Sequence, residues 1–215
     1  MSELARRSMV GVLLIAVALA AAVLGGYAFA TLVALAACVM FYEWRRIIRG
    51  WGFGWQVAGF VYALVPALAL LWIRDRFQVA GAAMGLELLL WVFVTTWSVD
   101  IGAYFAGRSI GGPKLAPAIS PNKTWAGLLG GMVAAALFGG LWAWLLQLPA
   151  ILILLAAPFA AAAQGGDLFE SWLKRRGGVK DSGHWLPGHG GALDRLDGLV
   201  VVATLTAAAM IKGLL

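Results

Sequence analysis

The sequence has very few of the residues from which disulfide frameworks and zinc sites are built. Of its 215 residues, one is cysteine, Cys38, and two are histidine. A lone cysteine excludes a disulfide within the chain, and two histidines without matching spacing argue against a zinc site. The sequence also has no continuous basic face and no stretch that would fold as a separate soluble domain. We therefore expect no nucleic acid among its partners.

Charged residues are scarce as well, at 12% of the chain, whereas 62% of the residues are hydrophobic. With a mean hydropathy of +0.89, this composition predicts an integral membrane protein. Apolar runs of the length needed to cross the hydrocarbon core as helices recur along the chain. We expect an all-α, polytopic fold with about seven transmembrane helices: residues 9–24, 27–41, 55–73, 79–106, 125–148, 150–169 and 193–214.

Neither a repeat nor a low-complexity linker divides the chain, so we expect residues 1–215 to form a single transmembrane domain. The first apolar run lacks a cleavage site followed by a polar sequence, which favours a retained helix over a secretory signal. Cys38, within the second run, is interpreted as a packing residue. Trp44, Trp51 and Trp55 flank a loop and are interpreted as aromatic anchors at a membrane interface.

The basic residues are distributed unevenly among the segments that connect the apolar runs. With the N-terminus in the cytoplasm, 13 of the 16 lysines and arginines fall on the cytoplasmic side, and Arg74, Arg76 and Lys212 fall outside. Positively charged loops stay in the cytoplasm, so we expect this orientation in a bacterial-type inner membrane. Such loops also attract anionic membrane lipids, which by itself accounts for a net charge of +6.

A strongly charged segment lies between the last two apolar runs. Residues 171–197 carry five basic side chains, three acidic side chains and both histidines. A chain this apolar has little need for such a segment unless it contacts charged ligands. We interpret it as the reaction centre, facing the cytoplasm, where it would bind phosphate and metal.

Carboxylates lie at both ends of this segment. Asp167, Ser171 and Lys174 share one face of the preceding helix, and Asp194 and Asp197 lie three residues apart at the start of the following one. Carboxylate oxygens are ligands that Mg²⁺ shares with phosphates. Two plainer interpretations remain. Asp167 could form only a structural ion pair, with Lys174 or with an arginine of a neighbouring helix. Asp194 and Asp197 could be present only because the helix dipole favours acidic residues at a helix N-terminus.

A glycine-rich stretch, Gly188-His189-Gly190-Gly191, precedes the last helix. It predicts accessible backbone N–H groups that point at an anion. The stretch lacks the Gly-Lys-Ser/Thr ending of a Walker A loop. His189 either binds phosphate or caps the loop. The carboxylates, the glycine-rich stretch and the nearby lysines and arginines together fit an enzyme of phosphoryl or nucleotidyl transfer.

A second polar region begins in the fourth apolar run. Asp100 lies inside that run, where a carboxylate either lines a polar cavity or pairs with Arg108 or Lys123. Ser120, Lys123 and Thr124 follow on a separate cytoplasmic loop. These three residues either bind substrate or form an ordinary turn and helix cap.

The two regions resemble the phosphatidate cytidylyltransferases, also called CDP-diacylglycerol synthases. One block is Ser171-x-Leu-Lys174-Arg175, Lys180-Asp181-x-Gly183, Leu186-Pro187-x-His189-Gly190-Gly191 and Asp194-Arg195-Leu196-Asp197. The other is Asp100-x-Gly102-Ala103-Tyr104-Phe105-x-Gly107-Arg108, Lys114-Leu115-Ala116-Pro117 and Ser120-Pro121-x-Lys123-Thr124-Trp125-x-Gly127. The resemblance covers residues 97–198 and extends more weakly over the apolar remainder. The chain is short for this family in its front half, about residues 1–78. Ala192 replaces a larger residue of the family but removes no functional group.

The resemblance implies an enzyme that transfers CMP from CTP to phosphatidic acid, giving CDP-diacylglycerol and pyrophosphate in phospholipid biosynthesis. It implies one or two Mg²⁺ ions, with a monovalent cation as a further candidate, and it is compatible with a homodimer. We assign as primary metal ligands Asp167 and Asp194. Asp197 is a secondary candidate, which either binds the metal or orients Arg195. We assign as catalytic residues Asp167, Asp194, Lys174, Arg175, Lys180 and Arg195. We assign as substrate-binding residues Asp100, Ser120, Lys123, Thr124, Ser171, Asp181, His189, Gly190 and Gly191.

Other functions remain as alternatives. The main one is a related CTP-dependent transferase that acts on another lipid phosphate or a lipid alcohol, because it would share the metal and nucleotide sites. A secondary transporter would show inverted repeats and helices broken at the membrane midplane. A CDP-alcohol phosphotransferase would carry Asp-Gly-x-x-Ala-Arg, whereas Asp197-Gly198 continues here with Leu-Val-Val.

Overall fold

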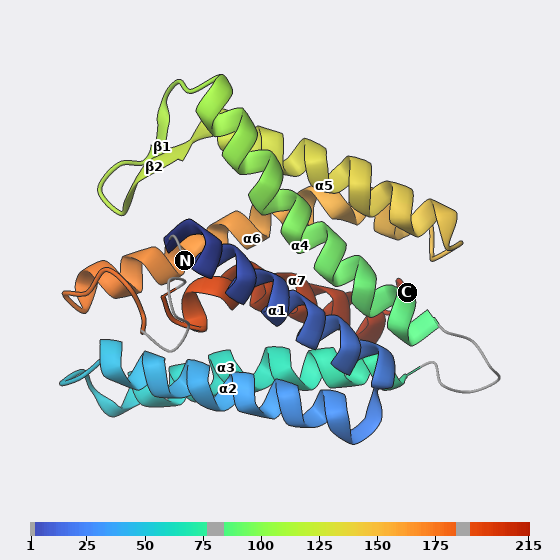
Figure 1. The fold of residues 1–215 in the computed structure, drawn as a ribbon, viewed down its shortest axis with the longest axis horizontal. Helices are drawn as coiled ribbons and strands as arrows, with labels where there is room; N and C mark the ends of the chain where they lie inside the picture. Colours follow the sequence, from blue (N-terminus) through green and yellow to red (C-terminus); the bar gives the residue numbers. More distant parts are fainter. Residues whose placement is uncertain (1–2, 77–83, 184–189) are drawn as a thin grey trace.

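The computed structural model describes residues 3–76, 84–183 and 190–215, with side chains from residue 9 onward. These residues form seven helices and one two-stranded sheet. The helices are α1 (Glu3–Leu24), α2 (Gly26–Ile47), α3 (Phe53–Asp75), α4 (Met84–Ser109), α5 (Trp125–Leu145), α6 (Ile151–Arg176) and α7 (Leu193–Ile211). They run roughly along the long axis of the molecule, and the segments that connect them gather at its two ends (Figure 1).

Five of these helices, α2 to α6, are long and apolar enough to cross a membrane. Their outer faces carry large apolar side chains, such as Leu129, Leu137 and Leu154, which are 58%, 63% and 71% exposed. Apolar side chains on the outside of a helical bundle suit a hydrocarbon solvent, in which every backbone polar group must also be satisfied within the helices. The predicted all-α membrane fold is confirmed at this level.

A small β-hairpin between α4 and α5 departs from the all-α prediction. Strands β1 (Lys114–Ala116) and β2 (Ser120–Thr124) pair antiparallel, with Lys114 opposite Thr124 and Ala116 opposite Ser120. Prolines at positions 113, 117 and 121 cannot donate a backbone hydrogen bond and prevent a helix here. The hairpin ends directly at α5, where the Thr124 hydroxyl accepts a hydrogen bond from the Gly127 N–H at 3.0 Å. The predicted helix cap is therefore present.

Helices α4 and α5 approach each other to backbone contact. A Cβ atom at Gly102 would lie 2.5 Å from the carbonyl oxygen of Gly130, and one at Gly131 would lie 2.9 Å from that of Val99. Glycines that face each other in this way let membrane helices pack closely. This contact fixes the helix that carries Asp100 relative to the hairpin that carries Lys123.

An apolar cluster joins α2, α3, α6 and α7 at the end where the charged segment lies. It contains Met40, Trp44, Ile47, Ile48, Ala63, Leu173, Leu193 and Val200. Trp44 is 2% exposed, and its indole N–H donates to the Trp55 carbonyl oxygen at 2.8 Å. The prediction that Trp44 is an interfacial anchor is therefore wrong, because the missing side chain of Gly59 leaves room for its ring. Cys38, interpreted as a packing residue, is exposed on the described structure.

Candidate active site

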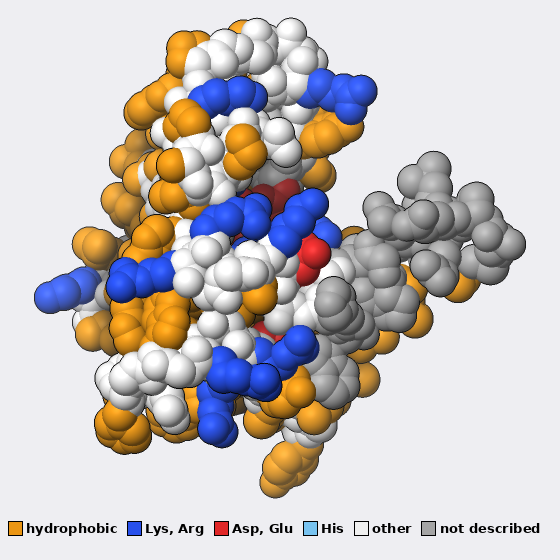
Figure 2. Space-filling view, turned by 90° about the vertical axis from the view of Figure 1, so that its left-hand side faces the viewer, with side chains coloured by type: hydrophobic (Ala, Val, Ile, Leu, Met, Phe, Trp, Pro, Cys, Tyr) orange, Lys and Arg blue, Asp and Glu red, His pale blue; other side chains and the backbone are white. Residues whose placement is uncertain are grey.

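Lysine–carboxylate pairs lie at one end of the bundle and join the hairpin, α6 and α7. Lys123 pairs with Asp167, and Lys174 pairs with both Glu170 and Asp194. Seen from this end, several groups of lysine and arginine side chains lie on the surface, with a few acidic side chains among them (Figure 2). The charged segment and the second polar region, predicted separately, therefore meet in one place.

The Asp167 carboxylate holds the hairpin against α6. Its Oδ2 atom pairs with the ammonium of Lys123, which also lies 3.5 Å from the Gln164 carbonyl oxygen. The Ser171 hydroxyl, one turn further along α6, lies 3.4 Å from Asp167 Oδ1. The plainer interpretation of Asp167 named Lys174 or an arginine as its partner. The partner is instead a lysine 44 positions earlier in the sequence, which the hairpin brings to α6.

Lys174 joins α6 to the start of α7. Its ammonium lies 2.9 Å from Glu170 Oε1, one turn earlier on the same helix, and also pairs with Asp194 Oδ1. The side chain of Glu170 is 1% exposed, and those of Lys174 and Asp194 are each 12% exposed. Charges this far from solvent interact strongly, so one cation shared by two anions fixes the relative positions of the two helices.

The other oxygen of Asp194 organises the loop that precedes α7. Asp194 Oδ2 accepts from the Ser182 and Gly191 backbone N–H groups, each at 2.9 Å, and lies 2.9 Å from the Ser182 hydroxyl. The left-handed conformation of Gly190, with φ of 82°, brings the chain close to this carboxylate. The carboxylate is therefore held in place by both the loop and α6.

Glu43, on α2, supports the same loop from the other side. Its Oε2 atom accepts from the Leu193 N–H at 2.8 Å and lies 2.9 Å from the Ser182 hydroxyl. Its Oε1 atom accepts from the Ala192 N–H at 3.1 Å. The side chain is fully buried, and a Cβ atom at Gly191 would collide with it. A carboxylate of α2 thus caps the first turn of α7, a position favoured by the helix dipole.

These contacts account for one N–H group of the glycine-rich stretch, that of Gly191, and for the two N–H groups that follow it. The N–H groups of Gly191, Ala192 and Leu193 do point at anions, but the anions are the carboxylates of Asp194 and Glu43. Within the described residues, these donors are used to hold the loop. His189 lies outside the described residues.

Asp100 and Asp197 interact electrostatically with Asp167. The charges of Asp100 and Asp167 both act on Asp197, and those of Lys123 and Arg195 act on Asp100. Asp197 Oδ1 also accepts from the Gly198 N–H at 2.8 Å. Arg108, one predicted partner of Asp100, instead donates to the Tyr104 hydroxyl at 3.0 Å.

The remaining predicted residues lie at the edge of this site. The Arg175 guanidinium donates to the Val179 carbonyl oxygen at 3.4 Å, and Lys180 and Asp181 are exposed on the loop after α6. Ser120 begins β2 and is partly exposed, whereas Thr124 is buried as the cap of α5. These positions leave Lys180 and Asp181 accessible to a ligand that approaches from the solvent.

Three residues of the site were missed as site residues by the sequence interpretation: Glu43, Glu170 and Ser182. Glu43 is the one acidic residue in the basic stretch that ends α2, and a carboxylate at the end of an apolar run is a signal that could have found it. Glu170 lies four residues before Lys174, the spacing of a helical ion pair. Ser182 has no signal of its own, because its role depends on a helix 139 positions away.

The chemistry of the donor set fits a hard divalent cation. Asp167 and Asp194 each already hold one positive charge, the ammonium of a lysine, and carboxylate oxygens are the ligands Mg²⁺ prefers. In the three described ranges, no three histidine, cysteine, aspartate or glutamate side chains converge closely enough to hold a metal ion. The Mg²⁺ site therefore stays a prediction.

Comparison with known proteins finds relatives that carry one name. A phosphatidate cytidylyltransferase of Brucella suis biovar 1 is 46% identical over 176 residues, which are 81% of this chain and 62% of that protein. The Bacillus subtilis protein of the same name is 47% identical over 121 residues, covering 55% of this chain and 45% of its own length. That of Rickettsia bellii is 33% identical over 186 residues, covering 82% and 78%. The chain spans less than two thirds of the Brucella protein.

The pattern that defines the cytidylyltransferase family matches residues 54–212. This range contains every described carboxylate and lysine of the site except Glu43. Because the match covers most of the chain and includes both polar regions, the chain belongs to the cytidylyltransferase family.

Proposed function

We propose that this chain is a phosphatidate cytidylyltransferase, which transfers CMP from CTP to phosphatidic acid and forms CDP-diacylglycerol and pyrophosphate. The observation that carries the proposal is the meeting of Lys123, Asp167, Lys174 and Asp194 at one end of an apolar bundle. A charged site at the end of membrane helices suits a reaction between a lipid phosphate and a water-soluble nucleotide. The names of the relatives support the same reaction.

The reaction needs charge neutralisation more than it needs a strong base. The phosphate of phosphatidic acid is already anionic near neutral pH and is itself the nucleophile. One of its oxygens attacks the α-phosphorus of CTP, the bond to the β-phosphate oxygen breaks, and pyrophosphate leaves with the electron pair. Positioning two anions against each other is then the main task of the protein.

Lysines and arginines of the site perform that task. Lys123 lies between the two polar regions, and Lys174 lies between α6 and the start of α7. Lys180, Arg175 and Arg195 extend the positive charge toward the solvent side. Asp167, Asp194 and Asp197 would hold Mg²⁺, which supplies further charge neutralisation for the phosphates when bound. Glu43 and Ser182 hold Asp194 in place and act through it.

We further infer the arrangement in the membrane. The N-terminus and the charged loop would face the cytoplasm, and all seven helices, including α1 and α7, would cross the inner membrane. Positive loops remain in the cytoplasm, and Arg45, Lys123 and Lys180 belong to segments at the site end. Arg74 lies at the other end, where it donates to the Ala22 carbonyl oxygen near the end of α1. CTP would then enter from the cytoplasm.

A substrate panel tests the proposal. Purified protein would be incubated with labelled CTP, Mg²⁺ and one lipid at a time: phosphatidic acid, other lipid phosphates, or lipid alcohols. We expect CDP-diacylglycerol and pyrophosphate from phosphatidic acid alone. A CDP-linked product from a different lipid would instead establish the related CTP-dependent transferase.

A further inference from the structure

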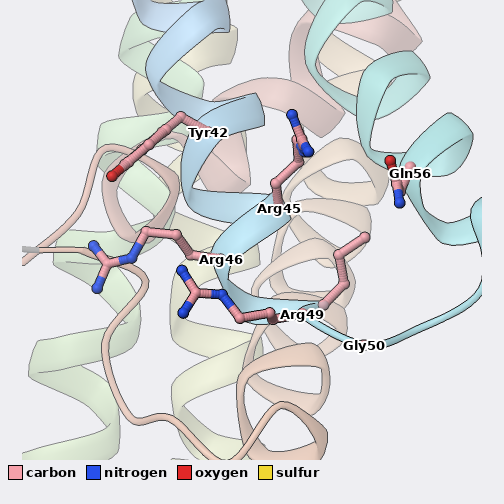
Figure 3. A pocket seen from close by; sticks show the side chains of 7 residues that line it. Tyr42, Arg45, Arg46, Arg49, Gly50 and Gln56 are labelled. Atoms are coloured by element: carbon pink, nitrogen blue, oxygen red, sulfur yellow. The ribbon is translucent and has the colours of Figure 1, made fainter.

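A pocket separate from the candidate active site lies at the turn between α2 and α3. It has a volume of about 370 Å³ and is lined by Tyr42, Arg45, Arg46, Ile48, Arg49, Gly50 and Gln56. We refer to it as the arginine pocket. Its volume falls within the range of about 300–1,000 Å³ that is typical of small-molecule sites. Tyr42 and the arginines extend from the end of α2, and Gln56 comes from the start of α3 (Figure 3).

The spacing of the α2 residues places them on one face. Tyr42, Arg45, Arg46 and Arg49 follow the i, i+3, i+4, i+7 pattern, and all four are exposed. Glu43 lies on a different face, which is buried against the loop before α7. The two faces of α2 therefore serve different purposes, and the arginine pocket opens to the surroundings.

Within the described residues, no carboxylate neutralises the charge of the arginine pocket. Among the described side chains, no carboxylate forms an ion pair with Arg45, Arg46 or Arg49, whereas Lys123 and Lys174 at the same end are both paired. Arginine presents a planar fork of N–H donors that matches phosphate oxygens. Three such groups from α2 line one cavity, and the Gln56 amide of α3 lines it as well, which is a donor set suited to a phosphate group.

The surroundings of the arginine pocket select a lipid as the carrier of that phosphate. From the pocket, α3 continues with exposed apolar side chains on one face: Phe53, Val57, Phe60, Val61, Leu64 and Leu68. Trp51 and Trp55, in contact at a ring distance of 4.9 Å, lie at the same turn, and aromatic pairs of this kind mark the headgroup level. A ligand with a charged head and apolar tails would satisfy both surfaces.

We propose that the arginine pocket binds the phosphate headgroup of an anionic phospholipid whose acyl chains lie along α3. Its lining residues up to Gly50 precede residue 54, where the family match begins. The binding is separate from the transfer reaction, so it holds whether or not the proposed activity is correct.

The test measures lipid binding to the purified full-length chain by native mass spectrometry. Phosphatidylglycerol is the probe, because its phosphate is a diester and cannot replace the nucleophile of the proposed reaction. Phosphatidylcholine, which has no net charge, and inorganic phosphate are the comparison ligands. The variants are R45Q/R46Q/R49Q, which removes the charge, and R45K/R46K/R49K, which keeps the charge but removes the fork.

We expect the glutamine variant to bind phosphatidylglycerol at least about tenfold more weakly, because several charge-assisted contacts are lost. The lysine variant should lie between it and the unchanged protein, and millimolar inorganic phosphate should not displace the lipid. Equal binding by all three proteins would overturn the proposal, as would equal affinity for phosphatidylcholine. Displacement by free phosphate would mean that the pocket is a site for soluble anions. If the glutamine variant does not fold, the lysine variant is compared with the unchanged protein. This comparison distinguishes recognition of the phosphate by guanidinium groups from simple attraction by positive charge.

Discussion

The hydroxyl of Ser182 lies 2.9 Å from Glu43 Oε2, although the two residues are 139 positions apart in the sequence. The same hydroxyl lies 2.9 Å from Asp194 Oδ2. Because a hydroxyl has one proton, it donates to one of the two carboxylates at a time, and it bridges them. Glu43 therefore influences the candidate active site through the loop, without facing the substrates.

Replacing Glu43 with alanine should destabilise the protein and reduce its turnover together. The N–H groups of Ala192 and Leu193 would lose their acceptor in a buried place, at a cost of at least about 2 kcal/mol. We expect the melting temperature in detergent to fall by about 5 °C or more. Glu87→Ala is the control, since no hydrogen bond or ion pair of the Glu87 side chain is found in the described part of the chain. An equal change in both variants would contradict a specific role for Glu43.

Asp167→Asn and Asp194→Asn should each lower turnover by at least about a hundredfold, because each removes a charge that would hold Mg²⁺. Turnover would be measured over a range of Mg²⁺ concentrations, alongside the melting temperature. Asp167→Asn should stay folded, since this side chain is 32% exposed and has few contacts. Near-normal turnover at any Mg²⁺ concentration would refute the metal role of the altered residue.

Lys174→Ala and Lys180→Ala should both lower the rate of the transfer reaction, but only one of them should lower the stability of the protein. Each removes a phosphate contact and should lower kcat/KM with CTP roughly ten- to a hundredfold. Lys174→Ala also leaves buried Glu170 and Asp194 without a cation, so it alone should lower the melting temperature. The measurement is kcat/KM with CTP and with ATP. A Lys180→Ala enzyme that keeps its full rate, or that accepts ATP, would argue against charge neutralisation as its role.

Cysteine labelling in whole cells should place the two ends of the bundle on opposite sides of the membrane. The starting protein would be Cys38→Ala, because Cys38 is exposed and would itself react. A cysteine at Lys180 should react with reagents that enter the cytoplasm, and one at Arg74 with reagents that stay outside. Outside labelling at Lys180 would reverse the orientation and exclude CTP entry from the cytoplasm.

The sequence was sufficient to predict the helices because apolar length determines them. The run predicted at residues 193–214 corresponds to α7 (Leu193–Ile211), and that at 125–148 to α5 (Trp125–Leu145). Asp194 and Lys174 were predicted as members of one site because the motif that contains them is continuous in the sequence. Their ion pair follows from the loop that folds α7 back onto α6.

Contacts between distant segments could not be predicted from local patterns. Lys123 reaches Asp167 only because the prolines of the hairpin turn the chain back toward α6. The burial of Trp44 depends on Gly59 of another helix, and nothing in the residues around Trp44 indicates that space. Glu43 lies in a stretch dominated by arginine, and nothing in that stretch indicates that its carboxylate contacts the start of α7.

The capping of α7 by Glu43 also has a consequence for biosynthesis. Chains are made from the N-terminus, so α2 exists well before residues 182–193 leave the ribosome. Until then, the Glu43 carboxylate lacks the three donors that surround it in the finished protein. The candidate active site is therefore completed only when the last helix is in place.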